Sequence, residues 1–287
     1  MTGARVRGIA GLGAIALAMT LLAACSGDDD DVDATRSASA TYVALGDSIS
    51  AGGGAGPYEA HSGACLRSRR AWPRLLDVEV PGVELSDLRA CGGATVDQLI
   101  GATAALGLDP QIPDTPDPEV DLVTLTIGAN DLRYLALVFV CAADCGQSTP
   151  DAEATYQATL AALSLSLARD VYPALRAAYP EARIIHVGYP RLVTGGDPVD
   201  CPWLASDEQV TLDRVLGEMN GAIQASVEQA GSTTVEYLDI TEALAGHELC
   251  SSDPWVQPLD AGSDGVHPTA DGYRGIADAV RSAVGDR

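Results

Sequence analysis

The sequence of 287 residues contains no lysine, so all 17 of its basic residues are arginine. This absence excludes catalysis through a lysine Schiff base and nucleotide binding through a P-loop lysine. Positive charge is scarce as well, because 40 acidic residues give a net charge of −23. Nucleic-acid binding requires a basic face that neutralises phosphates, so no nucleic-acid partner is expected.

A long apolar run is also lacking near the N-terminus. The uncharged stretch from Ile9 to Leu22 follows Arg5 and Arg7, and it is too short to span a bilayer comfortably. A charged start followed by a short apolar segment is typical of a secretory signal. We therefore expect a signal peptide over residues 1–24.

The signal ends in Leu22-Ala23-Ala24-Cys25, which resembles the bacterial lipobox. The resemblance implies a lipoprotein signal, a lipidated Cys25 and an exported protein. The protein would be anchored at the outer face of the cell membrane, with release to the extracellular space also open. There are two alternatives. One is ordinary secretion with a free Cys25, and the other is an uncleaved anchor.

Residues 25–40 contain five aspartates and small residues without an apolar period, which indicates a flexible acidic tether. Residues 1–40 hold three Arg and five Asp, a net −2, so residues 41–287 carry −21 of the total −23. No polar linker divides residues 41–287, which predicts one domain.

Six cysteines follow Cys25, an even number that suggests three disulfides in an exported chain. They are Cys65, Cys91, Cys141, Cys145, Cys201 and Cys250. The count alone does not fix the connectivity, although pairing neighbours along the chain is simplest. A metal site at Cys141 and Cys145 is the rival interpretation. The lack of a second suitable Cys/His pair nearby argues against metal.

Short β-branched runs alternate with helical patterns along the domain. Strands are predicted at 41–45, 83–88, 121–127, 183–187 and 233–240. Helices are predicted at 95–106, at 151–179 with a break at Pro173, at 206–229 with a capping box of Ser206 and Gln209, and at 270–284. The repeated strand-then-helix order predicts an α/β fold with a parallel sheet between two helical layers.

Ligands bind beyond the carboxyl ends of the strands in such a sheet, so the residues after each strand are site candidates. Ser48, in Gly46-Asp47-Ser48, follows the first strand on a turn suited to a nucleophile. Gly92, with Gly93 as the alternative, follows the second and offers a backbone N–H. Asn130 follows the strongest strand, and its amide is a candidate oxyanion donor.

A serine nucleophile needs a base, and His267 is the candidate among four histidines. Asp264 lies three residues before it and is expected to orient the imidazole. His186 lies within a predicted strand and is expected in the core. His61 and His247 lie in cysteine-containing loops and are expected at the surface.

Ser48, Gly92, Asn130 and His267, with Asp264, together resemble the GDSL esterases and lipases of the SGNH hydrolase superfamily. The resemblance covers nearly all of residues 41–287. It implies a three-layer, flavodoxin-like α/β/α sandwich and hydrolysis of acyl esters through an acyl-enzyme at Ser48. The Ser48 and Gly92 N–H groups and the Asn130 amide would form the oxyanion hole, and no metal or organic cofactor is needed.

The six cysteines and residues 187–192 further resemble the secreted actinobacterial branch of this superfamily. That branch implies three sequential disulfides, Cys65–Cys91, Cys141–Cys145 and Cys201–Cys250. Some of its members orient the histidine through a backbone carbonyl. Because Asp264 is present here, a full triad is the expectation.

The sequence defines the substrate less closely than it defines the chemistry. A small-molecule or lipid acyl ester is the main expectation. There are two alternatives. The same site could deacetylate a cell-wall or plant polysaccharide, or the protein could be a binding lipoprotein without catalytic activity. The segments 52–70, 134–150 and 189–205 are expected as loops that shape the pockets. Tyr134 and Trp203 fit pocket walls or core equally, and the oligomeric state is open.

Overall fold

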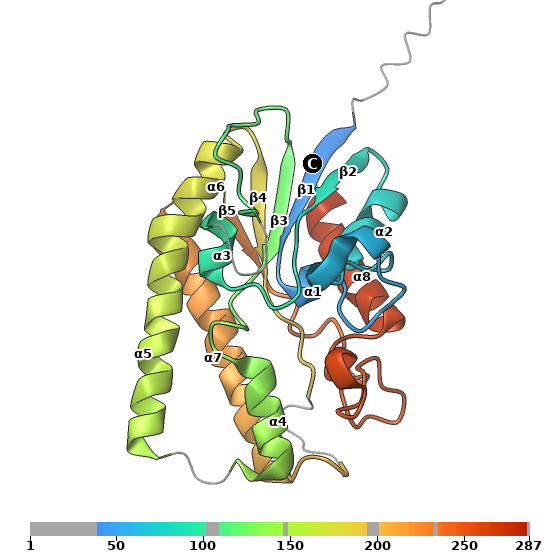
Figure 1. Ribbon diagram of the computed structural model, residues 1–287, viewed down its shortest axis with the longest axis vertical. Coiled ribbons are helices and arrows are strands. Elements are labelled where there is room, and N and C mark those ends of the chain that lie inside the picture. The colour runs from blue at the N-terminus through green and yellow to red at the C-terminus, as the bar shows by residue number, and fades with distance from the viewer. Residues whose placement is uncertain (1–38, 102–108, 146–148, 194–200, 232–234, 286–287) are drawn as a thin grey trace, which may run out of the picture. The chain divides into compact units, whose positions relative to one another are not determined.

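The computed structural model describes residues 39–101, 109–145, 149–193, 201–231 and 235–285. A five-stranded sheet lies at its centre, with all neighbouring strands parallel and in the order β2-β1-β3-β4-β5 (Figure 1). The strands are β1 (Ala40–Gly46), β2 (Val83–Leu88), β3 (Leu122–Thr126), β4 (Arg183–Val187) and β5 (Val235–Leu238). The strand order reverses between β1 and β3, which places the ligand crevice at their carboxyl ends.

The pairing of β1 with β3 runs from Tyr42 opposite Leu122 to Gly46 opposite Thr126. Both strands therefore end at the same level, and the residues that follow them are brought side by side. Every residue of β3 is buried, as expected for a central strand covered on both faces.

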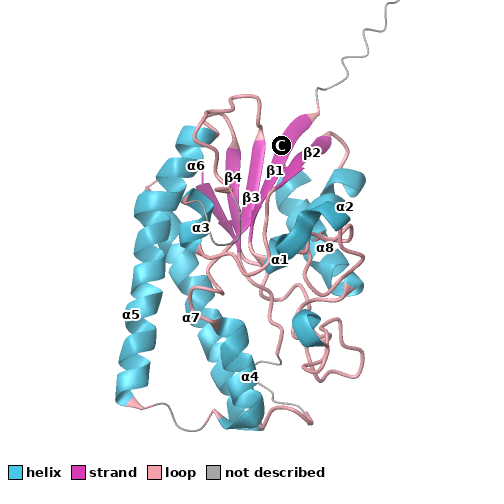
Figure 2. Ribbon diagram, in the orientation of Figure 1, coloured by secondary structure: helices cyan, strands magenta, loops and turns pink. Residues whose placement is uncertain are grey.

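Helices cover both faces of the sheet (Figure 2). On one face, α2 (Trp72–Glu79) packs against α8 (Ala270–Gly285). The other layer contains α3 (Val96–Ile100), α5 (Pro150–Ser166), α6 (Tyr172–Ala178) and α7 (Ser206–Ala230). A short π-helical segment, Leu167–Val171, joins α5 to α6 and contacts α3 and α7. The predicted three-layer α/β/α sandwich is confirmed.

Two further helices, α1 (Ser48–Ala51) and α4 (Tyr134–Asp144), lie at the carboxyl end of the sheet. The expectation of a loop over 134–150 was wrong for α4. Its first ten residues are apolar around the whole circumference, so they show no helical period in the sequence.

The other predicted elements agree with the structure apart from their ends. Pro173 is the second residue of α6, directly after the π-helical segment, so the predicted break is confirmed. The predicted helix 95–106 ends as α3 at Ile100, and residues 102–108 lie outside the described part. Of the predicted strand 233–240, residues 233 and 234 lie outside it too.

The capping box of α7 differs from the prediction by one residue. Glu208, rather than Gln209, accepts a hydrogen bond from the backbone N–H before the helix, that of Ala205, at 2.7 Å. Gln209 is buried instead and donates to the carbonyl of Leu204. The side chain of Gln209, which the sequence pattern assigned to the cap, therefore lies on the buried face of the helix.

Three disulfides join neighbouring cysteines along the chain, as the resemblance implied. They are Cys65–Cys91, Cys141–Cys145 and Cys201–Cys250. The first lies beside the carboxyl ends of β1 and β2, the second closes the last turn of α4, and the third joins the segment before α7 to the segment after β5.

Gly46 is the position at which the fold depends most directly on glycine. Its φ is +125°, and a Cβ there would lie 2.3 Å from the carbonyl oxygen of Thr126. We expect Gly46→Ala to lower the free energy of unfolding by about 2–4 kcal/mol, because both the φ angle and the clash oppose a side chain. Urea denaturation would measure this change.

Gly217 provides the matched control within α7. It is exposed, and a Cβ there would meet no atom within 4 Å. Gly217→Ala should raise the unfolding free energy by about 0.5–1 kcal/mol, because alanine favours a helix interior. Equal effects of the two substitutions would contradict the constraint at Gly46.

Candidate active site

The site begins at the turn that follows β1. The Asp47 N–H donates to the Thr126 carbonyl at 2.9 Å, and the Asp47 side chain caps α1 by accepting from the Ile49 N–H. Ser48 is the first residue of that short helix. Its side chain is therefore presented at the carboxyl edge of the sheet, as the sequence predicts.

Gln111 fixes the end of β1 from the side. Its side-chain amide donates to the Gly46 carbonyl and accepts from the Gly46 N–H, at 2.9 and 2.7 Å. The Cys91 N–H also donates to the Gly46 carbonyl. The buried Gln111 side chain thus makes the hydrogen bonds that a neighbouring strand would make at the end of the sheet. It thereby holds Gly46, two positions before Ser48.

The structure brings Ser48 and His267 into contact. The Ser48 Oγ lies 2.9 Å from Nε2 of His267, and the other ring nitrogen, Nδ1, lies 3.1 Å from the Gly265 carbonyl. A carbonyl only accepts, so Nδ1 carries the proton and Nε2 is free to accept from the Ser48 hydroxyl. The imidazole is thus held in the tautomer that a general base needs.

Burial lowers the pKa of His267, while the backbone carbonyl acceptors of Gly265 and Asp264 raise it. The side chain is only 8% exposed. The net lowering favours the neutral imidazole, which is the form that accepts a proton.

The expected contact between the Asp264 carboxylate and His267 is not formed. The carboxylate accepts a hydrogen bond of 2.6 Å from the Tyr58 hydroxyl, which in turn accepts from the Gly54 N–H at 2.8 Å. The full triad expected from the sequence is therefore not assembled, because the carbonyl of Gly265 occupies the position at Nδ1. Asp264 instead joins the histidine turn to the glycine segment after α1.

The three expected oxyanion donors differ in the hydrogen bonds that they already make. The Ser48 N–H has no acceptor within the described residues, and Asn130 uses one amide hydrogen to donate to the Ala94 carbonyl at 2.9 Å. The N–H of Gly92 already donates to the Cys65 carbonyl at 2.9 Å. The neighbouring Gly93 N–H finds no acceptor in the described part of the chain, which leaves it available.

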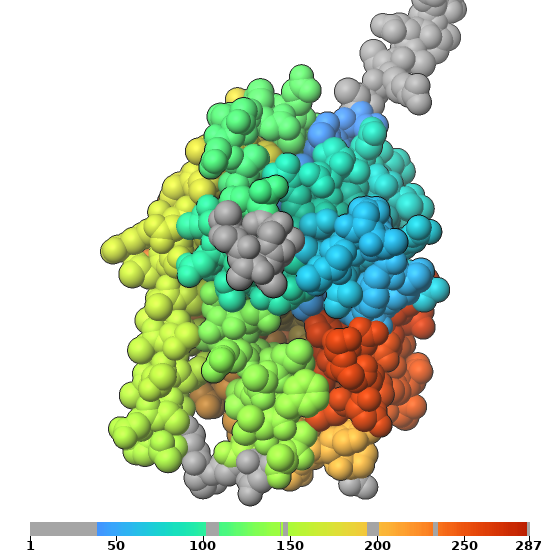
Figure 3. All heavy atoms as spheres, in the orientation of Figure 1, coloured from blue at the N-terminus to red at the C-terminus, as the bar shows by residue number. Residues whose placement is uncertain are grey.

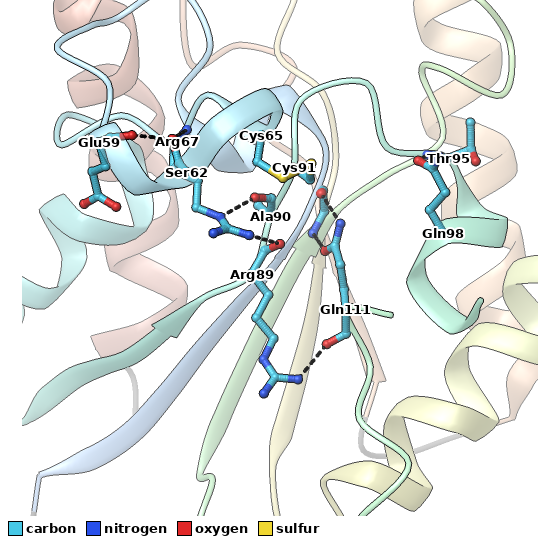
Figure 4. Close-up of a disulfide and its surroundings, with 11 residues drawn as sticks. Glu59, Ser62, Cys65, Arg67, Arg89, Ala90, Cys91, Thr95, Gln98 and Gln111 are labelled. Atoms are coloured by element: carbon cyan, nitrogen blue, oxygen red, sulfur yellow. Dashed lines mark hydrogen bonds between the residues drawn. A yellow bond between two sulfur atoms is a disulfide. The ribbon is translucent and has the colours of Figure 1, made fainter. Parts of the chain in front are cut away.

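The Cys65–Cys91 disulfide supports this glycine segment (Figure 4). Arg67, next to Cys65 in the fold, donates from Nε to the Ala90 carbonyl and from Nη2 to the Arg89 carbonyl. The backbone that leads into Gly92 and Gly93 is thus held by one covalent bond and by charged donors.

A buried tyrosine connects the serine turn to the asparagine loop. Tyr189 donates to the Asp47 carboxylate and accepts from the Ala129 N–H. Burial raises the pKa of Asp47 to about 7, although the hydrogen bonds from Tyr189 and Ile49 lower it. Burial likewise raises the pKa of Asp131 to about 6, against the bond from the Val96 N–H. Both carboxylates therefore brace loops and do not contact His267.

An apolar pocket opens beside Ser48, His267 and Asn130. Its walls are Ile49, Ala129, Tyr134, Leu135, Tyr189, Leu192, Leu216 and Val266. A second, larger cleft of about 220 Å³ meets the same three residues. Its walls include Gly53, Tyr58, Leu66, Gly92, Gly93, Leu135, Ser263 and Asp264. Ser48, Asn130 and His267 thus lie between two spaces, and the larger one adds polar groups to a mainly apolar lining.

His186 and His61 lie where the sequence predicts, whereas His247 is only partly exposed and stacks on Trp255. His186 is fully buried, and burial lowers its pKa to about 3. The His61 side chain is 82% exposed, and that of His247 is 29% exposed. Among the described residues, no group of three His, Cys, Asp or Glu side chains could hold a metal ion.

Several supporting residues were not found from the sequence. Tyr58 and Gln111 lie in connections without a periodic pattern, so no signal marks them. Tyr189 follows β4 by two residues, so inspection of that strand end would have found it. Tyr273, on α8, donates to the Gly53 carbonyl at 2.8 Å, and the pattern that predicts this helix does not mark the residue.

Comparison with known proteins gives one consistent result. The model of the GDSL-like lipase/acylhydrolase family matches residues 44–274. A lipase of Streptomyces rimosus is 31% identical over 277 residues, covering 94% of this chain and 97% of the relative. Lipase 1 of Streptomyces coelicolor is 31% identical over 237 residues, covering 82% of each chain.

Solved structures agree with these relatives. An extracellular lipase from Streptomyces rimosus is 28% identical, with a TM-score of 0.65, over 85% of this chain and 99% of that one. A phospholipase A1 from Streptomyces albidoflavus is 29% identical, with a TM-score of 0.66 and the same coverage.

The geometry of His267 predicts how the reactivity of Ser48 depends on pH. With His267 as the base, labelling of Ser48 by a fluorophosphonate would require the neutral imidazole, so the rate should fall as pH is lowered through the pKa of His267. Because burial lowers that pKa, we expect the midpoint below the ordinary histidine value of about 6.5.

The rate of labelling across pH 4–9 would be measured by mass spectrometry, with circular dichroism at each pH to show that the fold persists. A midpoint above about 6.5 would contradict this arrangement. It would indicate a carboxylate at Nδ1, because a nearby negative charge raises a histidine pKa.

Proposed function

The chain belongs to the GDSL-like lipase/acylhydrolase family and is a carboxylic ester hydrolase, and we propose that Ser48 and His267 are its catalytic pair. The observation that carries the proposal is the 2.9 Å contact between Ser48 Oγ and His267 Nε2, beside an apolar pocket. The relatives named lipase and phospholipase A1 support an acyl ester of a lipid as the substrate.

The proposed reaction has two steps. The Ser48 Oγ attacks the acyl carbonyl while Nε2 of His267 takes its proton, and the resulting imidazolium returns the proton to the leaving alcohol. Water then attacks the acyl carbonyl with His267 as the base, the bond to Ser48 Oγ breaks, and the imidazolium returns the proton to Oγ as the carboxylic acid leaves. The Gly265 carbonyl holds Nδ1–H throughout and stabilises the imidazolium, in the role that a carboxylate would have in a triad.

Negative charge on the carbonyl oxygen is stabilised by three donors in this proposal. They are the N–H groups of Ser48 and Gly93 and the second amide hydrogen of Asn130. Gly93 replaces Gly92 because the N–H of Gly92 is bound to the Cys65 carbonyl. Preformed donors of this kind stabilise the transition state without reorganisation during the reaction.

The two spaces beside Ser48 suggest how the substrate lies. We place the first carbons of the acyl chain in the apolar pocket, which has about 40 Å³ of free space, and the rest of the ester in the larger cleft, which contains Tyr58, Ser263 and Asp264. An apolar pocket with few polar groups favours a hydrocarbon chain over a sugar. The relatives named lipase and phospholipase A1 favour an ester of a lipid over an acetylated polysaccharide.

Export and anchoring remain part of the proposal. The lipobox-like Leu22-Ala23-Ala24-Cys25 supports a lipid anchor at Cys25, and residues 26–40 would be the tether between the anchor and the domain. A related lipase is described as extracellular. Within the described residues, no helix is long and apolar enough to cross a membrane.

Labelling with a fluorophosphonate followed by peptide mass mapping tests the catalytic pair. We expect a covalent adduct on Ser48 in the wild type, and none in Ser48→Ala or His267→Ala, because the serine is activated only by the neutral imidazole. Lack of an adduct in the folded, oxidised wild type would exclude an activated serine. An adduct on another residue would identify that residue, in place of Ser48, as the nucleophile.

A substitution at Asp264 tests the role of its carboxylate. Asp264→Asn keeps an acceptor for the Tyr58 hydroxyl, so kcat/KM should fall by less than about tenfold, whereas loss of a triad carboxylate costs about 10⁴-fold. The pH midpoint for activity should stay unchanged. The measurement is kcat/KM on a soluble ester across pH.

Tyr58→Phe is the companion variant, because it removes the hydrogen bond itself. If Asp264 acts through Tyr58, then Asp264→Ala and Tyr58→Phe should lower kcat/KM by similar factors, and the double variant should lose little more. If Asp264→Asn lowered kcat/KM by about 10⁴-fold while Tyr58→Phe left it unchanged, Asp264 would instead act directly on His267 as the third member of a triad.

A further inference from the structure

Helix α4 (Tyr134–Asp144) is apolar on all sides. Its ten residues before Asp144 are Tyr134, Leu135, Ala136, Leu137, Val138, Phe139, Val140, Cys141, Ala142 and Ala143. A helix without a polar face is normally buried all round or lies within a membrane. At eleven residues α4 is about 16 Å long, too short to span a bilayer.

Only one side of α4 is buried in the protein. Tyr134, Val138 and Cys141 are 5%, 0% and 0% exposed, and the helix packs against α7 on that side. The buried residues follow at spacings of four and three, which is one face of a helix. The packing therefore accounts for half of the apolar surface of α4.

The opposite side is exposed, and we name it the α4 face: Ala136, Phe139, Val140 and Ala143. These residues follow at spacings of three, one and three and so form a continuous stripe. Phe139, the only phenylalanine of the chain, is 41% exposed, and Val140 is 54% exposed. Figure 3 shows the segment, in green, at the surface in the lower part of the view. Apolar surface of this kind indicates a binding surface.

The position of the α4 face indicates what it binds. The helix starts at Tyr134 and Leu135, which line the apolar pocket, and Leu135 also lines the larger cleft. A surface in contact with Phe139 and Val140 therefore lies one to two helical turns from the mouth of the site. We propose that the α4 face binds the lipid–water interface of an uncharged or zwitterionic lipid, so that an acyl chain enters the apolar pocket from the bound layer.

Charge supports this occupant over an anionic membrane. Residues 41–287 carry a net charge of −21 and no lysine, and Arg133 is the one basic residue next to α4. Binding to anionic lipid depends on clusters of basic residues, whereas here repulsion would oppose it. An interfacial helix that binds through apolar area alone fits a neutral surface.

The inference rests on the proposed function in one respect, the placement of the acyl chain in the apolar pocket. Binding to the lipid surface is tested separately from hydrolysis. Vesicle binding is measured in the mature chain, residues 25–287, with Cys25→Ser and Ser48→Ala, so that neither the signal peptide, a lipid anchor nor hydrolysis interferes. Hydrolysis of p-nitrophenyl butyrate, a soluble ester, is measured in the same variants with Ser48 intact.

Val140→Glu and Phe139→Glu are the test variants, and Val78→Glu is the matched control. Val78, on α2, is 82% exposed and gives the same change of charge away from the site. On sucrose-loaded phosphatidylcholine vesicles, sedimentation should show about tenfold weaker partitioning for both test variants. The control should bind as the parent does, and all variants should hydrolyse the soluble ester equally.

Three outcomes would overturn the proposal. The first is unchanged partitioning in both test variants, and the second is tighter binding of the parent to phosphatidylglycerol than to phosphatidylcholine vesicles. The third is a dimer of the parent, seen by sedimentation velocity, that Phe139→Glu dissociates; the α4 face would then bind a second copy. Absence of ester hydrolysis in the parent would instead contradict the proposed function and leave the vesicle result interpretable.

Discussion

The hydrogen bond between Ser48 and His267 joins side chains 219 positions apart, so two separate parts of the chain must be fixed and then meet within 2.9 Å. Ser48 is held by the end of a buried strand. His267 has no strand before it, and packs instead on Gly53 and Gly54. A Cβ at either glycine would lie within 2.9 Å of the His267 side chain. The glycine segment, rather than the sheet, therefore sets how closely the base approaches the nucleophile.

The carboxylates around the site show how an acidic protein keeps a neutral base. Asp47, Asp131 and Asp264 receive hydrogen bonds from Tyr189, from a backbone N–H and from Tyr58, and none of them bonds to the imidazole. A carboxylate at Nδ1 would raise the pKa of the histidine, whereas a carbonyl orients it with a smaller effect. The site thus obtains orientation from a neutral group, and burial keeps the imidazole unprotonated.

The positions of Ser48 and Asn130 were predictable from the strand ends, and the disulfide pairing was predictable from the family resemblance. The role of Gly92 was not, because the choice between adjacent N–H groups depends on a carbonyl 27 positions away, that of Cys65. The partner of Asp264 was hidden for the same reason, since Tyr58 lies 206 positions away. Strand-end rules locate a group at the site, but tertiary contacts decide which hydrogen bonds it has left to make.

Helix α4 connects the chemistry of the site to its surroundings. Its first turn lines the pocket, its last turn is closed by the Cys141–Cys145 disulfide, and its buried face packs on α7. Because the helix packs on α7 along its buried face, the stripe with Phe139 is left exposed on the opposite side. Substrate access therefore depends on how the protein lies against a lipid layer, and the same helix that walls the pocket determines that orientation.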